Sequence, residues 1–168
     1  MIAIVMGVSG SGKTTIGKAL ARKLGWRFIE GDDFHPPQNV AKMAAGIPLE
    51  DADRQPWLER IHEELRRLEK NGESAVVACS ALKHAYRKRL RAGLKALRFV
   101  YLHGSLELIR ARVAKRKHRY MPASLLESQF ATLEPPKDAL AVDVAGDVRA
   151  SVAAIARRLR AAAPADGA

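Results

Sequence analysis

The sequence has one cysteine, few aromatic residues and no long apolar run. Because Cys79 has no partner cysteine, no disulfide can form within the chain, and we expect a buried core thiol there. No apolar stretch approaches the roughly 20 residues that a membrane-spanning helix needs. The apolar run at residues 2–6 has no basic segment before it and glycines soon after it, so it predicts a buried strand and not a signal peptide. These absences favour a cytoplasmic protein that does not contact a membrane.

Acidic residues are scarce in the middle of the chain. Residues 83–119 hold thirteen Lys or Arg residues against one acid, Glu107, and the formal net charge of the chain is +11. This excess predicts an anionic partner: a nucleic acid, a membrane surface, or a small ligand with phosphate or carboxylate groups. Aromatic residues, on which single-stranded nucleic acids stack, make up only 5% of the sequence, which argues against a nucleic acid.

The remaining composition is that of an ordinary globular protein. The chain has 168 residues, of which 48% are hydrophobic and 28% charged. This length fits one domain with a substantial core. We expect residues 1–160 to form that domain and residues 161–168, which show no pattern, to be disordered.

Short apolar segments alternate with helical patterns along the chain. Strands are predicted at residues 2–6, 27–30, 74–79, 97–102 and 141–144, and helices at residues 13–24, 57–68, 105–115 and 147–159. This alternation predicts a three-layer α/β fold, with helices on both faces of a five-stranded parallel sheet. Residues 31–53 and 117–137 are polar and too long for ordinary connections, so we expect long loops that form a substrate cover and a lid.

The helix predicted at residues 57–68 has boundary signals. Asp51 or Asp53 is expected to cap its N-terminus, and Pro56 lies near its first turn. Gly72 follows just past its end, where a helix commonly stops at a glycine.

A phosphate-binding pattern follows the first predicted strand. The segment GVSGSGKT matches GxxxxGK[ST], in which glycines let successive backbone N–H groups point into one concavity at the N-terminus of a helix. Lys13 is expected to reach the β- and γ-phosphates and the Thr14 hydroxyl to bind Mg²⁺. ATP is therefore expected on this P-loop, which comprises Gly7, Val8, Ser9, Gly10, Ser11, Gly12, Lys13, Thr14 and Thr15.

GTPases and motor ATPases also have P-loops, so other motifs must decide between these classes. Residues 143–146 read DVAG, like the DxxG of GTPases, but they come late in the chain and no NKxD motif for base recognition is present. We interpret them as the last strand and a turn.

The second predicted strand ends in a run of acids, EGDD at residues 30–33. A small-molecule kinase needs a carboxylate that orients the acceptor hydroxyl and takes its proton, and this edge of the sheet faces the phosphate site. Asp32 is the preferred base and Asp33 the alternative. The third strand ends at Ser80 without the acid that commonly binds magnesium there, so Asp32 is also expected to help Thr14 hold Mg²⁺.

Four segments together resemble one known family. They read GVSGSGKTT, EGDDFHPPQNVAKMAAGIPLEDADRQPWL, VVACSALKHAYRKRLR and MPASLLESQFATLE, and they resemble the small bacterial gluconokinases, which are related to shikimate kinase. The resemblance spans residues 4–148. It implies the P-loop fold of nucleoside-monophosphate kinases, transfer of the γ-phosphate of ATP to the 6-hydroxyl of D-gluconate, and a homodimer.

The resemblance also implies roles for single residues. Asp32 matches the residue beside the acceptor hydroxyl, in agreement with the reasoning above. Residues 110–120 would form the lid and its base, with Arg112 and Arg116 as catalytic cations over the phosphates. Arg110 and the Pro135-Pro136 region are both candidates for contacts to the adenine. The sugar-acid pocket would be lined by Arg54, Ser80, Lys83 and Gln129.

The lid departs from the family pattern. It is expected to span about residues 116–130, and it reads Lys-His-Arg-Tyr at residues 117–120 where the family has Lys-Gly-His-Phe. This difference leaves open which lid residue contacts phosphate. His35 matches the family motif, and its role is either a hydrogen bond that fixes the loop or a contact to the substrate.

Two alternatives remain at the level of the sequence. One is a kinase for shikimate or another hydroxy acid, although residues 79–81 read CSA where a shikimate kinase would have three glycines. The other is a basic nucleic-acid-binding protein with an incidental P-loop, which only the net charge favours.

Overall fold

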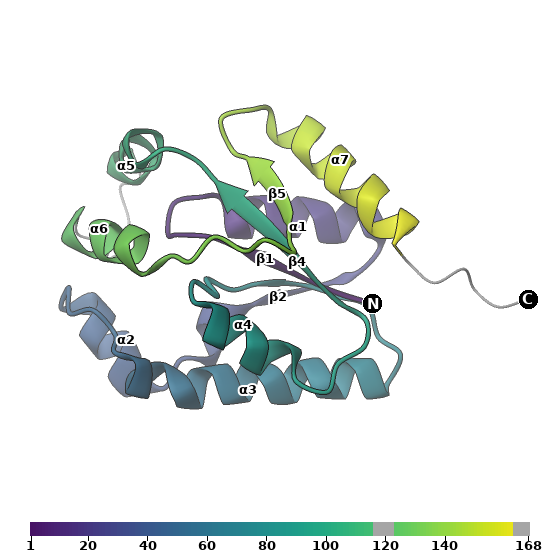
Figure 1. The fold of residues 1–168 in the computed structure, drawn as a ribbon, viewed down its shortest axis with the longest axis horizontal. Coiled ribbons are helices and arrows are strands. Elements are labelled where there is room, and N and C mark those ends of the chain that lie inside the picture. Colours follow the sequence, from purple (N-terminus) through teal and green to yellow (C-terminus); the bar gives the residue numbers. More distant parts are fainter. Residues whose placement is uncertain (116–122, 163–168) are drawn as a thin grey trace, which may run out of the picture.

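The computed structural model describes residues 1–115 and 123–162 (Figure 1). Five strands form one sheet in the order β2-β3-β1-β4-β5, and all neighbouring strands are parallel. The strands are β1 (Ile2–Met6), β2 (Arg27–Glu30), β3 (Ala75–Ala78), β4 (Leu97–His103) and β5 (Leu140–Asp143). The sheet predicted from the sequence is confirmed.

The central strand β1 contributes to two hydrophobic cores. Successive side chains of a strand point to opposite faces of the sheet. Ile2, Ile4 and Met6 therefore belong to one core cluster, and Ala3 and Val5 belong to the other. A strand buried on both faces has an unbroken apolar sequence, as β1 does.

Helices cover both faces of the sheet. Figure 1 shows α1 (Lys13–Leu24) and α7 (Val148–Ala161) on one face, with α3 (Asp51–Lys70) and α4 (His84–Arg91) on the other. The apolar stripe of α3 packs on the sheet through Trp57, Leu58, Ile61, Leu65 and Leu68. The three-layer α/β fold expected from the sequence is confirmed.

Shorter helices lie in stretches where the sequence predicted loops. The 3₁₀ helix η1 (Gly31–Phe34) and α2 (Pro37–Ala44) lie in the expected cover, and α6 (Ala123–Thr132) lies in the expected lid region. The prediction of long loops was wrong there, and α4 was missed. Pro37 occupies the first helical position of α2, where proline is tolerated, so it marks the start of a helix and not a loop. The helix predicted at residues 105–115 is α5 (Leu106–Ala114). Within the described ranges, no helix is long and apolar enough to cross a membrane.

The N-terminus of α3 differs from its prediction. Glu50 is the capping residue, and its backbone N–H donates to Oδ2 of Asp53 at 2.9 Å. Asp51 is already the first helical residue. The prediction of Asp51 or Asp53 as the cap was therefore wrong, because the helix begins with a capping box in which Asp53 reaches back to the cap. Gly72 lies past the C-terminus with a φ of +67°, as the sequence predicted.

Two smaller interpretations of the sequence are confirmed. Cys79 is fully buried, and burial raises the pKa of its thiol to about 12, as expected for a core residue. Asp143 ends β5, and its Oδ1 accepts a hydrogen bond from the backbone N–H of Ala145 at 2.8 Å. Residues 143–146 thus form a strand end and a turn.

Burial of the apolar stripe of α3 should stabilise the fold strongly. Leu65 is fully buried between α3 and the sheet, so Leu65→Ala should lower the free energy of unfolding by about 2–5 kcal/mol through lost burial and a cavity. Urea denaturation followed by circular dichroism measures this. Arg66→Ala, at an exposed position of the same helix, is the control and should change it by less than about 0.5 kcal/mol. Equal effects of the two substitutions would contradict the assignment of this helix face.

Candidate active site

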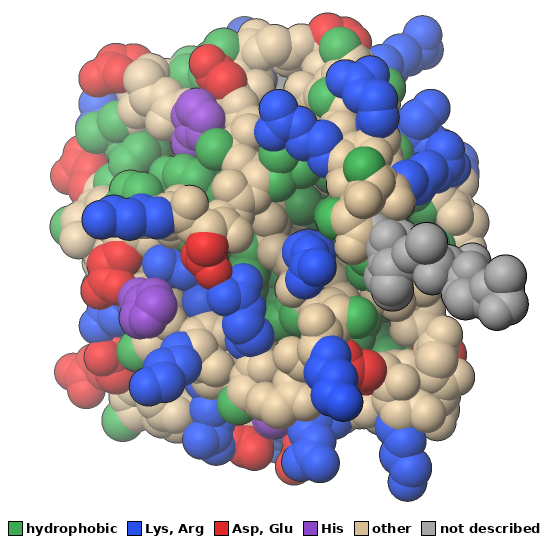
Figure 2. Space-filling model, turned by 45° about the vertical axis from the view of Figure 1, so that its right-hand side comes forward, with side chains coloured by type: hydrophobic (Ala, Val, Ile, Leu, Met, Phe, Trp, Pro, Cys, Tyr) green, Lys and Arg blue, Asp and Glu red, His purple; other side chains and the backbone are tan. Residues whose placement is uncertain are grey.

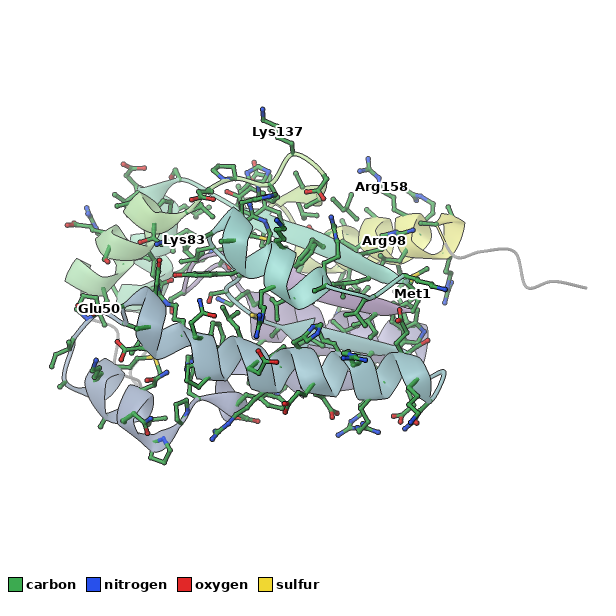
Figure 3. The ribbon with its side chains drawn as sticks, turned by 60° about the horizontal axis from the view of Figure 1, so that its bottom comes forward. Met1, Glu50, Lys83, Arg98, Lys137 and Arg158 are labelled. Atoms are coloured by element: carbon green, nitrogen blue, oxygen red, sulfur yellow. The ribbon has the colours of Figure 1, made fainter. Side chains whose placement is uncertain are left out.

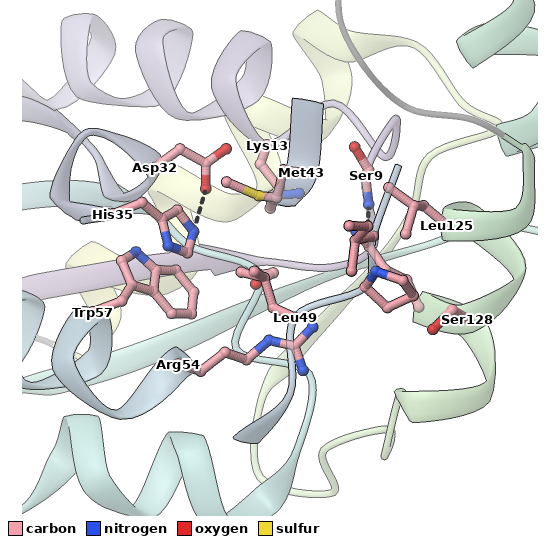
Figure 4. Close-up of a pocket in the computed structure, with 14 residues that line it drawn as sticks. Ser9, Lys13, Asp32, His35, Met43, Leu49, Arg54, Trp57, Leu125 and Ser128 are labelled. Carbon is pink, nitrogen blue, oxygen red and sulfur yellow. Dashed lines mark hydrogen bonds and ion pairs between the residues drawn. The ribbon is translucent and has the colours of Figure 1, made fainter. Parts of the chain in front are cut away.

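Segments that follow β1, β2 and β3 meet at one edge of the sheet, because parallel strands all end on the same side. A cleft lies at this edge (Figure 4). It is lined by Ser9, Lys13, Asp32, His35, Met43, Ile47, Pro48, Leu49, Arg54, Trp57, Ser80, Leu125, Ser128 and Gln129. The cleft therefore brings together most of the residues that the sequence analysis proposed for catalysis and for the sugar acid.

The P-loop forms a narrow cradle of backbone. Gly7 has a φ of +145° and Gly10 a φ of +80°, in the left-handed region that favours glycine. A Cβ atom on Gly7 would lie 2.5 Å from the Leu102 carbonyl oxygen, and one on Gly10 would lie 2.5 Å from Val113 Cγ2. Ser11 Oγ is buried and has no hydrogen-bond partner within residues 1–115 and 123–162. The cradle and this unpaired hydroxyl both fit a phosphate group.

Lys13 and Thr14 follow the cradle at the start of α1. Lys13 Nζ donates to the carbonyl of Val8 at 3.0 Å, and Thr14 Oγ1 donates to Glu30 Oε2 at 2.8 Å. Glu30 ends β2, and partial burial raises the pKa of its carboxyl while the hydrogen bond from Thr14 opposes this shift. Glu30 was not predicted as a site residue, although the EGDD run places an acid at the end of a strand beside the P-loop.

Asp32 lies on η1, directly after β2, and its side chain is 67% exposed. His35 Nε2 lies 3.9 Å from Asp32 Oδ1, and the buried imidazole ring stacks on Trp57 (Figure 4). Burial lowers the pKa of His35, and the charge of Asp32 opposes this shift. Asp33 is not among the residues that line the cleft, so the geometry favours Asp32 as the base.

Arg54 lies on α3 and extends into the cleft (Figure 4). Its Nη1 donates to the phenol oxygen of Tyr86 at 3.1 Å, and the Tyr86 hydroxyl donates to the Asp51 carboxylate. Lys83 also donates to Asp51, at 2.8 Å, near the N-terminal end of α3 (Figure 3). The two donors lower the pKa of Asp51. Lys83 does not line the cleft, contrary to its prediction, and instead anchors the carboxylate that holds Tyr86 beside Arg54.

Helix α6 forms another wall of the cleft. The backbone N–H of Ser9 donates to Gln129 Oε1 at 2.7 Å, which joins α6 to the P-loop. Leu125 and Ser128 of the same helix also line the cleft. Arg116, with the rest of residues 116–122 of the predicted lid, lies outside the described residues.

A second pocket lies on the other side of the P-loop, between α5 and the segment that joins β5 to α7. It is lined by Gly10, Ser11, Gly12, Thr15, Ile16, Arg112, Lys115, Val144, Gly146, Val148 and Ser151. Arg112 Nη2 donates to the Val144 carbonyl at 2.5 Å, so the guanidinium lies here and not beside Asp32. Arg110 lines neither pocket, and its Nη2 pairs with Glu127 Oε1 at 2.7 Å. Arg112 thus lies beside P-loop residues that include Gly10 and Thr15, whereas Arg110 lies in neither pocket.

Basic side chains are interspersed with acidic and uncharged ones on the face shown in Figure 2. Across the part of the chain that the structure describes, the basic residues that pair with acids are Arg27, Lys42, Arg67, Lys83, Arg89, Arg91 and Arg110. Such pairs offset part of the positive charge that the sequence concentrates in the middle of the chain.

Comparisons of the sequence and of the structure with known proteins both find gluconokinases. Residues 2–136 match the family described as an AAA domain. The chain is 53% identical to the gluconokinase of Gluconobacter oxydans, over 80% of this chain and 76% of that protein. It is 46% identical to the thermosensitive gluconokinase of Escherichia coli, over 86% of this chain and 80% of that protein.

A solved structure shares the fold. The gluconokinase of Sinorhizobium meliloti superposes with a TM-score of 0.82 at 44% identity, over 96% of this chain and 97% of that one. The P-loop, the cleft at the edge of the sheet and these comparisons agree, and the chain belongs to the gluconokinase family of P-loop kinases.

Proposed function

We propose that this chain transfers the γ-phosphoryl group of ATP to the 6-hydroxyl of D-gluconate, giving 6-phospho-D-gluconate and ADP. One observation carries the proposal: a single cleft contains the P-loop cation Lys13, the exposed carboxylate of Asp32 and the cation Arg54. These groups match the needs of a phosphate donor, an acceptor hydroxyl and a sugar-acid carboxylate. Membership of the gluconokinase family supports gluconate as the acceptor.

The P-loop is proposed to bind the triphosphate. Backbone N–H groups of residues 7–15 surround the phosphates, and Lys13 exchanges its contact with the Val8 carbonyl for the β- and γ-phosphates. The pocket beside Thr15 and Arg112 lies next to this loop, so it is the proposed position of the nucleoside. Arg110, exposed on α5, could reach the adenine only after leaving Glu127.

Asp32 is proposed to act on the acceptor. Its carboxylate accepts the proton of the 6-hydroxyl while that oxygen forms a bond to the γ-phosphorus and the bond from the γ-phosphorus to the bridging oxygen breaks. The bridging oxygen leaves with ADP. Lys13 stabilises the negative charge that builds on the transferred group.

Mg²⁺ is proposed as the cofactor. Within the described ranges, no group of three or more His, Cys, Asp or Glu side chains could hold a metal by itself. The hydroxyl of Thr14 and the carboxylates of Glu30 and Asp32 are nonetheless the hard oxygen donors that suit Mg²⁺, which commonly takes the rest of its ligands from phosphate and water. When bound, the ion would neutralise charge on the β- and γ-phosphates.

The sugar acid is proposed to lie between α3 and α6. The Arg54 guanidinium can bind the carboxylate through two parallel hydrogen bonds, and Ser80 and Gln129 can contact hydroxyl groups. Residues 116–130, including Arg116, are proposed as the lid over the phosphates, within one kinase domain formed by residues 1–160. We further propose a cytoplasmic homodimer that binds neither nucleic acid nor membrane.

An acceptor screen tests the proposed function. Purified protein with ATP and Mg²⁺ is offered D-gluconate, shikimate, other sugar acids and nucleoside monophosphates, and ADP is measured with a coupled assay. Gluconate should give the highest kcat/KM. Turnover of shikimate or a nucleotide with no turnover of gluconate would overturn the proposal.

Substitution of the proposed base separates chemistry from nucleotide binding. Asp32→Asn should lower kcat by roughly 10²- to 10⁴-fold, the usual contribution of a general base, and leave the Kd for ATP measured without Mg²⁺ nearly unchanged. Asp33→Asn is the matched control and should keep near-normal turnover, because Asp33 does not line the cleft. A large loss in Asp33→Asn with little loss in Asp32→Asn would reverse the assignment.

The proposed carboxylate contact should affect KM for one substrate only. Arg54→Ala should raise the KM for gluconate roughly 10- to 100-fold, since a hydrogen bond to a charged group contributes about 1.5–3 kcal/mol. The KM for ATP should change less than about twofold. The control is Arg66→Ala on the same helix, which should change neither value. A rise in the KM for ATP alone would place Arg54 at the nucleotide.

A further inference from the structure

We propose that His35 is a positioning residue for Asp32, and that Asn39 fixes its imidazole in the tautomer whose Nε2–H faces the Asp32 carboxylate. The inference extends the proposed function, because it explains how the proposed base is held. It rests on contacts between η1, α2 and α3, none of which involves the P-loop.

Asp32 needs such a partner because of its position. It lies on a four-residue 3₁₀ turn, and its side chain is 67% exposed, so rotation of the carboxylate is little restricted by packing. Two further acids, Glu30 and Asp33, lie within three residues of it along the chain. The side chain of His35, in contrast, is only 4% exposed and is therefore held by packing. Its Nε2 lies 3.9 Å from Asp32 Oδ1.

The tautomer of His35 follows from the hydrogen bonds of Asn39. Asn39 is 1% exposed, and its Nδ2 donates to the backbone carbonyl of Asp53 at 2.7 Å. Since a carbonyl oxygen can only accept, this end of the amide must be the NH₂ group. The same Nδ2 lies 3.3 Å from His35 Nδ1, so its second hydrogen points to that ring nitrogen. Nδ1 is therefore the acceptor, and the ring proton is on Nε2, facing Asp32.

Trp57 fixes the plane of the imidazole. The two rings stack with centroids 4.3 Å apart and an interplanar angle of 11°. Trp57 is itself buried on α3, and its Nε1 donates to the carbonyl of Gly31 at 2.8 Å. Figure 4 shows His35 beside Trp57 in this arrangement. The stack and the Asn39 contact together prevent His35 from rotating its Nε2–H away from the cleft.

A donor of this kind selects one orientation of the base. At 3.9 Å the contact is electrostatic, and a small rotation of the exposed Asp32 side chain converts it to a hydrogen bond. One carboxylate oxygen then faces His35, and the other is left to accept from the substrate hydroxyl. His35 acts through Asp32, much as an orienting group acts through a catalytic side chain in other enzymes.

Two substitutions separate the donor from the ring. His35→Phe keeps an aromatic ring that can stack on Trp57 but removes the Nε2–H donor, whereas His35→Gln loses the ring but can place an amide N–H near the same point. With gluconate, His35→Phe should lower kcat about tenfold or more, with both KM values within about threefold. His35→Gln should recover most of that loss, and Asn39→Leu, which releases the tautomer, should lower kcat as His35→Phe does. Thermal unfolding identifies any variant that does not fold.

A purely structural role for His35 would reverse the order of kcat between His35→Phe and His35→Gln. If His35 only packs on Trp57, His35→Phe will turn over normally and His35→Gln will be the poorer enzyme, and that result would overturn the inference. A change in KM without a change in kcat would also overturn it, by making His35 a substrate contact.

A measurement without turnover tests the same arrangement. Histidine-selective ¹⁵N NMR of the wild-type protein should show His35 as the neutral Nε2–H tautomer, and Asn39→Leu should lose that preference. A proton on Nδ1 in the wild type would contradict the inference. This spectrum does not depend on the acceptor, so failure of the proposed function, seen as absent gluconate turnover, is distinguishable from failure of the tautomer assignment.

Discussion

The parallel pairing of β1 with β3 and β4 determines where the chemistry of this protein can occur. In that register, the segments after β1, β2 and β3 all emerge at one edge of the sheet. The P-loop, the acids after β2 and Ser80 are therefore neighbours, although about 70 residues separate the first from the last in the chain. The two hydrophobic cores that flank β1 hold this register, because a slip by one residue would exchange the side chains of the two faces.

The cleft contains side chains of opposite charge that come from different structural elements. Lys13 comes from the P-loop, Asp32 from η1 and Arg54 from α3, and each is linked to a different set of neighbours. Lys13 contacts the Val8 carbonyl, His35 faces Asp32, and Tyr86 accepts a hydrogen bond from Arg54. Because these groups come from separate elements, a donor phosphate, an acceptor hydroxyl and a carboxylate can each meet a group of suitable charge in one cleft.

The parts of the site that depend on local pattern could be predicted from the sequence. The P-loop follows from its glycine spacing between a strand and a helix, and Asp32 follows from an acid at a strand end. Glu30 belongs to the same run of acids, but its hydrogen bond with Thr14 is a side-chain contact that no local pattern encodes. The short helices α2, α4 and α6 were missed, and the polar, proline-containing sequence around α2 predicted a loop although Pro37 only starts the helix.

Contacts between residues far apart in the sequence explain why other side chains do not lie where the sequence predicted them. Lys83 follows the third strand, as a pocket residue could, but the Asp51 carboxylate attracts it away from the cleft. Arg110 pairs with Glu127 on α6 and lines neither pocket. The stack of His35 on Trp57 joins residues 22 positions apart, and no sequence pattern encodes such a contact.

The most direct test of the account is a crystal structure with D-gluconate and a non-hydrolysable ATP analogue bound together. The 6-hydroxyl oxygen should lie within about 2.6–3.2 Å of the Asp32 carboxylate and the gluconate carboxylate should lie on Arg54, with the analogue's phosphates on the P-loop. Gluconate bound in the opposite direction, or with its 6-hydroxyl beyond the reach of Asp32, would contradict the account.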